Sequence, residues 1–199
     1  MDVKALIVIM MSAVLVNNYV LSQFLGICPF LGASKELKSS VGMGFAVIFV
    51  MLLATTATWP IQTYLLERNG LGYLQTVVFI LIIAALVQLV EIVLRKYVPT
   101  LYTSLGVYLP LMATNCAILG VTIANIQKEH LYLEAVVNAL GAGLGFLLAM
   151  VIFSGIREHT ENADPPPSFK GIPVTLFSAA ILSLAFFGFS GVIENMFGS

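Results

Sequence analysis

The sequence predicts an all-α integral membrane protein with six transmembrane helices, arranged as two inverted three-helix repeats. The first observation is composition: of 199 residues, 59% are hydrophobic and 10% are charged, whereas a soluble domain carries about 25% charged residues. The second is that the apolar residues fall into six runs, each long enough for a helical span of about 20 residues. The third is that the connections are short and polar. We therefore expect one membrane domain over residues 1–199.

The six runs cover residues 3–30, 41–66, 71–94, 101–126, 131–156 and 172–193. The longest connection contains the triple proline Pro165–Pro167, which predicts an extended loop. No charged n-region with a small-residue cleavage site precedes the first run, so we expect it to remain as a span. The net charge of −1 offers no basic surface for nucleic acid.

The distribution of Lys and Arg favours both termini outside the cell. Basic residues are enriched in cytoplasmic loops, and the first, third and fifth connections carry six of them against three elsewhere. The six are Lys35, Lys38, Arg95, Lys96, Arg157 and Lys170, and the three are Lys4, Arg68 and Lys128.

The first and fourth runs are predicted to be broken into half-helices. As one helix, each would extend roughly 40 Å, against a hydrocarbon core of about 30 Å. The first contains Gly26-Ile27-Cys28-Pro29, in which Pro29 lacks the N–H that continues a helix. The fourth contains Pro110, then Asn115-Cys116, then Gly120. Irregular backbone at membrane depth persists only where it is buried in protein or lines a cavity.

The two predicted breaks resemble each other, since Cys28 and Cys116 both begin a C-x-x-L-G pattern after polar residues. With three spans each, the halves (approximately residues 1–100 and 101–199) must have opposite orientations. Broken helices at matching positions of inverted halves indicate a functional site near the bilayer midplane.

Three interpretations of the two cysteines stay open at this point. Free cysteines are often small buried packing residues. A disulfide would require Cα atoms within about 7 Å. As soft thiolate ligands, Cys28 and Cys116 would form half of a four-cysteine iron–sulfur set, and a pseudo-symmetric partner would supply the other half. His130 and His159 lie in predicted loops and offer no further ligand.

Residues around the cysteines are candidate supporting groups. Asn17, Asn18 and Asn115 could hydrogen-bond either cluster sulfurs or backbone freed at the breaks, and the alternative is ordinary helix–helix hydrogen bonding. Gly26 and Pro29 are expected to shape the turn around Cys28. Glycine stripes predict close helix packing; they comprise Gly42, Gly44, Gly141, Gly143 and Gly145.

At these motifs the sequence resembles a known family. The stretches VLVNNYVLSQFLGICPFLGASKEL and RKYVPTLYTSLGVYLPLMATNCAILGV are similar to A subunits of the Rnf complex, the ion-translocating ferredoxin:NAD⁺ oxidoreductase. E subunits of the sodium-translocating NADH:quinone oxidoreductase are the related alternative. The resemblance covers essentially the whole chain.

The resemblance implies six helices in inverted repeats with half-helices, in a bacterial or archaeal cytoplasmic (inner) membrane. It implies that Cys28 and Cys116 ligate a [2Fe–2S] cluster shared with a homologous membrane subunit of opposite topology. It further implies an electron relay between iron–sulfur and flavin-bearing subunits, coupled to translocation of Na⁺ or H⁺.

Two other classes of function remain as alternatives. A secondary transporter could use the broken helices to bind a solute, with incidental cysteines. A purely structural membrane scaffold would tolerate replacement of both cysteines.

Overall fold

The computed structural model describes residues 3–16, 18–28, 32, 37–66, 68, 72–97, 112–162, 166 and 171–197. All regular secondary structure in these ranges is helical, so the predicted all-α class is confirmed for them. In chain order the elements are α1 (Val3–Met11), the π-helix η1 (Ser12–Val16), α3 (Leu37–Ile61), the π-helix η2 (Gln62–Leu66), the 3₁₀ turn η3 (Gly72–Leu74), α5 (Gln75–Tyr97), α8 (Cys116–Gln127), α9 (Tyr132–Asn162) and α10 (Ile172–Phe197).

Three of the six predicted spans correspond to helices long and apolar enough to cross a membrane. These segments are Ser39–Leu66, Gly72–Val93 and Tyr132–Thr160. At the other three positions the described residues contain shorter apolar helical segments: Leu6–Leu15, Cys116–Gln127 and Ile172–Gly188. The complete six-span layout with inverted repeats stays a prediction.

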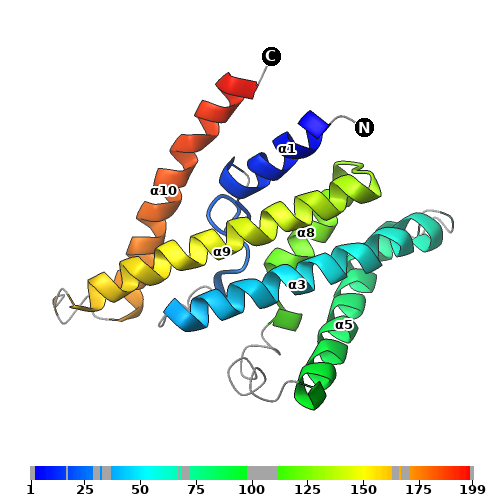
Figure 1. The fold of residues 1–199 in the computed structure, drawn as a ribbon, viewed down its shortest axis with the longest axis horizontal. Helices are drawn as coiled ribbons and strands as arrows, with labels where there is room; N and C mark the ends of the chain where they lie inside the picture. Colours follow the sequence, from blue (N-terminus) through cyan, green and yellow to red (C-terminus); the bar gives the residue numbers. More distant parts are fainter. Residues whose placement is uncertain are drawn as a thin grey trace.

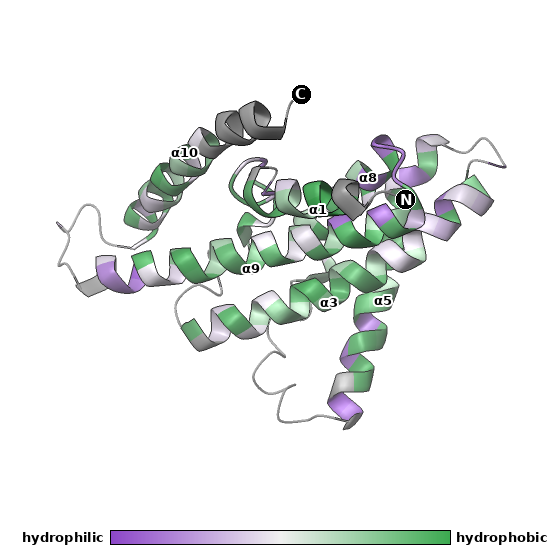
Figure 2. Ribbon diagram, turned by 45° about the horizontal axis from the view of Figure 1, so that its top comes forward, coloured by the Kyte–Doolittle hydropathy of each residue, from purple (hydrophilic) through white to green (hydrophobic). Residues whose placement is uncertain are grey.

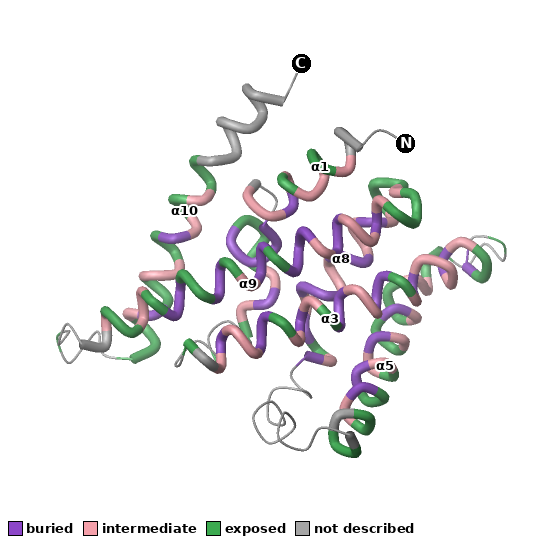
Figure 3. Tube along the Cα trace, in the orientation of Figure 1, coloured by how far each residue is buried: buried purple, intermediate pink, exposed green. Residues whose placement is uncertain are grey.

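Helix α9 is the centre around which the other helices pack (Figure 1). It contacts α1, η1, α3, α8 and α10. More than half of its apolar window, 56%, is buried inside the chain, compared with 17% for the window in α5. Figure 3 shows this contrast, with buried positions concentrated along α8 and α9 and a largely exposed α5. An apolar helix left this exposed faces lipid or other subunits.

Glycines allow the helices around α9 to approach closely, as the glycine stripes predict. A Cβ added at Gly143 would lie 2.8 Å from Cγ1 of Ile48 in α3 and 3.2 Å from its Cα. A Cβ at Gly141 would lie 3.0 Å from the Met10 carbonyl oxygen in α1. Small residues at such crossings permit backbone-to-backbone packing, which drives helix association in membranes.

Hydrophobic and hydrophilic residues are distributed according to their position along each helix. Figure 2 shows hydrophobic helix middles and hydrophilic residues gathered at helix ends, the α8–α9 turn among them. Inside the apolar core, Nδ2 of Asn138 donates to Oδ1 of Asn125 at 2.6 Å, and the Tyr19 hydroxyl is hydrogen-bonded to Asn138. These two hydrogen bonds connect α8, α9 and the segment after α1. They also give each buried polar side chain a partner, without which its burial would be costly.

The packing at Gly143 predicts the effect of adding one methyl group. Overpacking a tight crossing typically costs about 1–3 kcal/mol, and alanine regains about 1 kcal/mol of helix propensity over glycine. We expect Gly143→Ala to lower the free energy of unfolding of the full chain in detergent by about 1 kcal/mol. Gly155→Ala is the matched control, because the same helix has no atom within 4 Å of a Cβ there. Equal stability of the two variants would contradict the close α3–α9 packing.

Candidate cysteine site at the two helix breaks

Asn18 forms the first break in the helical chain. Helical structure ends at Val16, and Oδ1 of Asn18 then accepts the N–H of Val20 at 3.0 Å and that of Leu21 at 3.4 Å. Its Nδ2 donates to the carbonyl of Gly145 in α9 at 2.8 Å. Asn18 is 1% exposed. This side chain therefore satisfies backbone groups that the break leaves without helical partners.

The break begins earlier than the sequence predicted. The prediction rested on Gly26–Pro29, whereas the helix already ends at Val16 and the non-helical backbone extends to Gly26. The cause is the Asn18 side chain, which competes with the helix for backbone N–H groups. Pro29 and Asn17 lie outside the described residues, so their predicted roles stay predictions.

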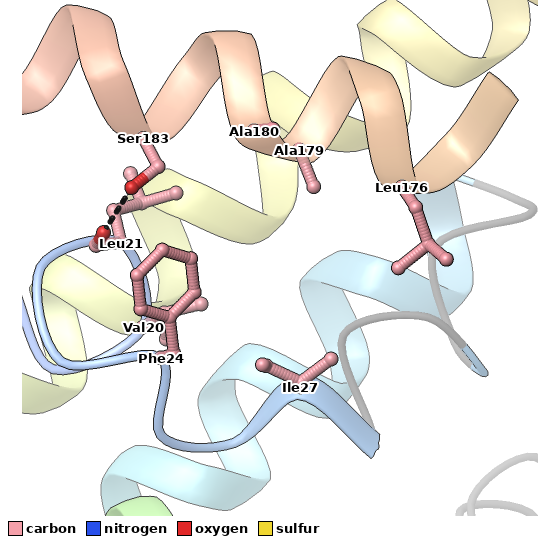
Figure 4. A pocket seen from close by; sticks show the side chains of 8 residues that line it. All are labelled: Val20, Leu21, Phe24, Ile27, Leu176, Ala179, Ala180 and Ser183. Carbon is pink, nitrogen blue, oxygen red and sulfur yellow. Dashed lines mark hydrogen bonds between the residues drawn. The ribbon is translucent and has the colours of Figure 1, made fainter. Parts of the chain in front are cut away.

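After Asn18 the chain runs through a compact non-helical segment to Gly26, and Ile27 and Cys28 are helical again. The Leu25 N–H donates to the Tyr19 carbonyl at 2.9 Å. Phe24 has φ 56° and Gly26 has φ 83°, both in the left-handed region. From α10, the Ser183 hydroxyl donates to the Leu21 carbonyl at 2.6 Å, as Figure 4 shows. Protein groups thus satisfy the irregular backbone, as membrane depth requires.

Asn115 precedes α8, at the position where the sequence predicted the second break; residues 98–111 before it lie outside the described residues. It has extended backbone (φ −72°, ψ 111°), and its Oδ1 accepts the Ala117 N–H at 3.0 Å as the N-cap of α8. Cys116 is consequently the first residue of α8. Pro110 lies outside the described residues.

The two breaks meet at Gly26 and Cys116, which are 90 residues apart in the sequence. The Gly26 N–H donates to Sγ of Cys116 at 2.8 Å. A Cβ at Gly26 would lie 3.1 Å from the Ala117 Cβ, 3.1 Å from Cε2 of Phe146 and 3.2 Å from Oδ1 of Asn115. Both the left-handed φ and the crowding favour glycine at this position.

Neither cysteine residue is fully buried. Cys28 is exposed, Cys116 is half-buried, and both are free cysteines, so the disulfide interpretation does not describe this structure. Free cysteine is among the most buried residue types in proteins. Cys28 and Cys116 therefore differ from the fully buried cysteines that serve as packing residues.

Asn115 also carries an unpaired donor beside Cys116. Its side chain is 3% exposed, and Nδ2 has no hydrogen-bond partner among the described atoms. A buried amide donor without a partner typically costs about 1–3 kcal/mol. Among the described residues, this amino group thus remains a donor without an acceptor.

An apolar hollow lies beside the first break (Figure 4). Its volume is about 110 Å³. Its walls come from the segment around Phe24 and Ile27 and from α10, at Leu176 and Ala179. The hollow brings an open apolar surface close to Cys28, the residue after Ile27.

Comparison with known proteins identifies the family. The family described as "Rnf-Nqr subunit, membrane protein" matches residues 6–193. The chain belongs to the Rnf-Nqr family of membrane subunits.

Relatives in this family cover nearly the whole chain. The A subunit of the Na⁺-translocating ferredoxin:NAD⁺ oxidoreductase complex of Acetobacterium woodii is 56% identical over 187 residues, 94% of this chain and 97% of that protein. The A subunit of the ion-translocating oxidoreductase complex of Syntrophotalea carbinolica is 49% identical, over 96% of this chain and 100% of that protein. The protein of the same description from Photorhabdus laumondii is 51% identical, over 91% and 94%. The family resemblance that the sequence motifs indicated is therefore confirmed.

Within this Rnf-Nqr chain, the structure brings together Gly26, Asn115 and Cys116 from the predicted site. Asn18 serves the freed backbone rather than a thiol, which supports the second of its two predicted roles. Sequence reasoning missed Phe146 and Tyr19, which pack against Gly26 and Gly120. The described residues contain no group of three or more His, Cys, Asp or Glu side chains that could hold a metal ion.

The junction predicts that Gly26 is less tolerant of alanine than a comparable glycine elsewhere. Gly26→Ala adds left-handed strain and three close contacts, whereas Gly171→Ala adds only the strain, because φ is 90° and no atom lies within 4 Å. We expect Gly26→Ala to destabilise the full chain by about 1–3 kcal/mol more than Gly171→Ala does. Chemical unfolding in detergent measures the difference, and equal losses would show that the two breaks do not pack as described.

Proposed function

We propose that the chain is an electron-relay membrane subunit of an Rnf-type ion-translocating ferredoxin:NAD⁺ oxidoreductase. In this proposal Cys28 and Cys116 supply half of the ligands of an intramembrane [2Fe–2S] cluster. The chain is one part of the redox enzyme complex and carries out no substrate chemistry alone. The cysteine–glycine contact between the two breaks carries the proposal, because it joins the segments of both cysteines.

The donor set at the junction fits such a cluster. Thiolate sulfur is the usual ligand of [2Fe–2S] centres. Cys116 is the first residue of α8, where the positive end of the helix dipole stabilises negative charge. The Gly26 N–H donor to Sγ and the unpaired Asn115 Nδ2 add hydrogen-bond donors suited to thiolate or sulfide acceptors.

When bound, the cluster would supply reversible one-electron transfer. The residues of this chain hold and insulate that site: Gly26 and Cys116 fix the junction, and Phe146 closes one side of it. Hydrogen bonds to the sulfurs set the reduction potential. The low dielectric of the surrounding apolar helices strengthens each of these electrostatic effects.

Two further thiolates must come from another subunit. Both cysteines of this chain are accessible, and the apolar hollow at Phe24 and Ile27 lies next to Cys28. We therefore propose that a homologous membrane subunit of opposite topology covers this face and completes the four-cysteine set. The names of the relatives, which are A subunits of oxidoreductase complexes, support assembly with further subunits.

In the same proposal, electron transfer drives Na⁺ or H⁺ across the cytoplasmic (inner) membrane, with both termini outside. Ferredoxin and NAD⁺ enter from the printed name of the Acetobacterium woodii relative. An E-type subunit of an NADH:quinone oxidoreductase is the second candidate within the Rnf-Nqr family.

Cysteine replacement in the complex tests the ligand assignment. In complexes purified anaerobically with all subunits, we expect Cys28→Ser and Cys116→Ser each to remove the iron of one [2Fe–2S] cluster and its reduced-state EPR signal. Electron transfer through the complex should stop in both. Ala113→Ser is the matched control, because it adds a hydroxyl beside the site and removes no thiol.

Subunit stoichiometry, measured by quantitative mass spectrometry, separates loss of a cluster from loss of assembly. Full iron content and an unchanged EPR spectrum in both cysteine variants would overturn the proposal. The broken helices should then be tested for solute transport.

The unpaired amide of Asn115 predicts a shift in reduction potential. Asn115→Ser retains an N-capping oxygen and removes the amino group. If this donor reaches a cluster sulfur, its loss should lower the midpoint potential by about 60 mV, which corresponds to about 1.4 kcal/mol for one electron. Asn125→Ser is the control, because Asn125 bonds Ala135 and Asn138. EPR-monitored redox titration measures both, and equal shifts would exclude a specific role for Asn115.

A further inference from the structure

A second cavity lies between the start of the chain and the α8–α9 turn. Its volume is about 150 Å³, roughly ten times the space that one water molecule requires. The lining includes Val8, Ile9, Ser12, Lys128, His130 and Asn138, and we call this cavity the turn pocket. It is separate from the cysteine junction, which lies at the opposite end of α8.

The turn pocket has one polar side and one apolar side. Lys128 brings a positive charge, and His130 and Asn138 bring polar groups, while Val8 and Ile9 of α1 form an apolar wall. Neither Glu129 nor Glu134 is among the lining residues. The pocket thus combines a cation with a hydrocarbon surface.

The backbone of the turn holds Lys128 and His130 in place. The Lys128 N–H donates to the Ala124 carbonyl at 3.0 Å, and the His130 N–H donates to the Asn125 carbonyl at 3.1 Å. Glu129 between them takes a left-handed φ of 51°. Glu134 accepts the Leu131 N–H at 3.1 Å and lies 3.6 Å from Nδ1 of His130. These bonds fix the polar side of the pocket before any ligand arrives.

Aromatic side chains place the turn pocket at the membrane–water interface. The Trp59 indole N–H donates to the His130 carbonyl at 3.1 Å. The rings of Trp59 and Tyr132 pack edge to face, with centroids 5.5 Å apart. Trp and Tyr concentrate at the level of lipid headgroups, and the neighbouring Leu131 and Leu133 are exposed apolar side chains suited to lipid.

We propose that the turn pocket binds an anionic phospholipid. Its phosphate lies against Lys128 and His130, and an acyl chain runs along Val8 and Ile9. Basic pockets between membrane helices recognise anionic headgroups, and one Lys near the surface contributes about 1 kcal/mol. A soluble anion would use the polar side alone, whereas the apolar wall and the interfacial depth suit a lipid.

The single tryptophan of the chain allows a direct test. Trp59 lies beside the pocket, and bromine atoms on lipid acyl chains quench tryptophan fluorescence at short range. The full chain is prepared in phosphatidylcholine vesicles that contain increasing fractions of brominated phosphatidylglycerol or brominated phosphatidylcholine. We expect saturable quenching, with about fivefold preference for phosphatidylglycerol, the factor that corresponds to about 1 kcal/mol.

Two charge-removing variants test whether the preference for phosphatidylglycerol arises at the turn pocket. Lys128→Gln should abolish the preference for phosphatidylglycerol and leave the emission maximum unchanged, which shows that the fold is intact. Arg95→Gln, at the exposed end of α5, removes the same charge elsewhere and should retain the preference. Equal quenching by the two lipids, or an unchanged preference in Lys128→Gln, would overturn the proposal.

Inorganic phosphate distinguishes the two sources of the anion. If 10 mM inorganic phosphate leaves the phosphatidylglycerol quenching unchanged, the apolar wall contributes as proposed. If phosphate displaces the lipid, the pocket is a site for the free anion, and the assignment to a lipid is wrong.

Discussion

The need to satisfy every backbone polar group within an apolar environment determines this structure. Helical structure is interrupted after Val16 and begins again in α8 at Cys116. At each place an asparagine accepts backbone N–H groups that lipid could not solvate. Asn18 accepts two backbone N–H groups after the first break, and Asn115 caps α8 after the second. Both side chains are buried, so each replaces the water that would cap a helix in a soluble protein. These two amides thus supply hydrogen bonds at both places that meet in the junction.

Helix α9 holds the segments around the candidate cysteine site together. Its glycines admit the backbone of α1 and η1 on one side and α3 on another. The Gly145 carbonyl receives the Asn18 amide, and Phe146 packs against Gly26. One turn of α9 therefore contacts the first break at two points, Asn18 and Gly26. Gly26 in turn adjoins Asn115 and Ala117 at the start of α8, so segments far apart in the sequence meet at a fixed position.

The sequence predicted the helices that depend on the length and hydropathy of an apolar run. The second, third and fifth apolar runs became long helices with ends within a few residues of those expected, because length and hydropathy determine such elements. The early start of the first break was not predicted, because proline is a strong local signal, whereas the position of the Asn18 amide depends on the Gly145 carbonyl in α9. Gly26 and Asn115 were recognisable beside the cysteines. Phe146 was not, because only tertiary packing brings it to Gly26.

The length of α8 connects the two proposed sites. Lys128 caps its C-terminal end and Cys116 begins it, with 12 residues in the helix. At 1.5 Å per residue the two ends lie about 18 Å apart along the axis. A bilayer is about 40–45 Å thick including its headgroups. If Lys128 contacts a lipid phosphate and α8 runs along the membrane normal, Cys116 lies close to the midplane.

An electron carrier at that depth divides the insulating layer into two shorter steps, each about half the membrane thickness. The proposed lipid site and the proposed cluster site are therefore linked by geometry, because the same helix sets the depth of both.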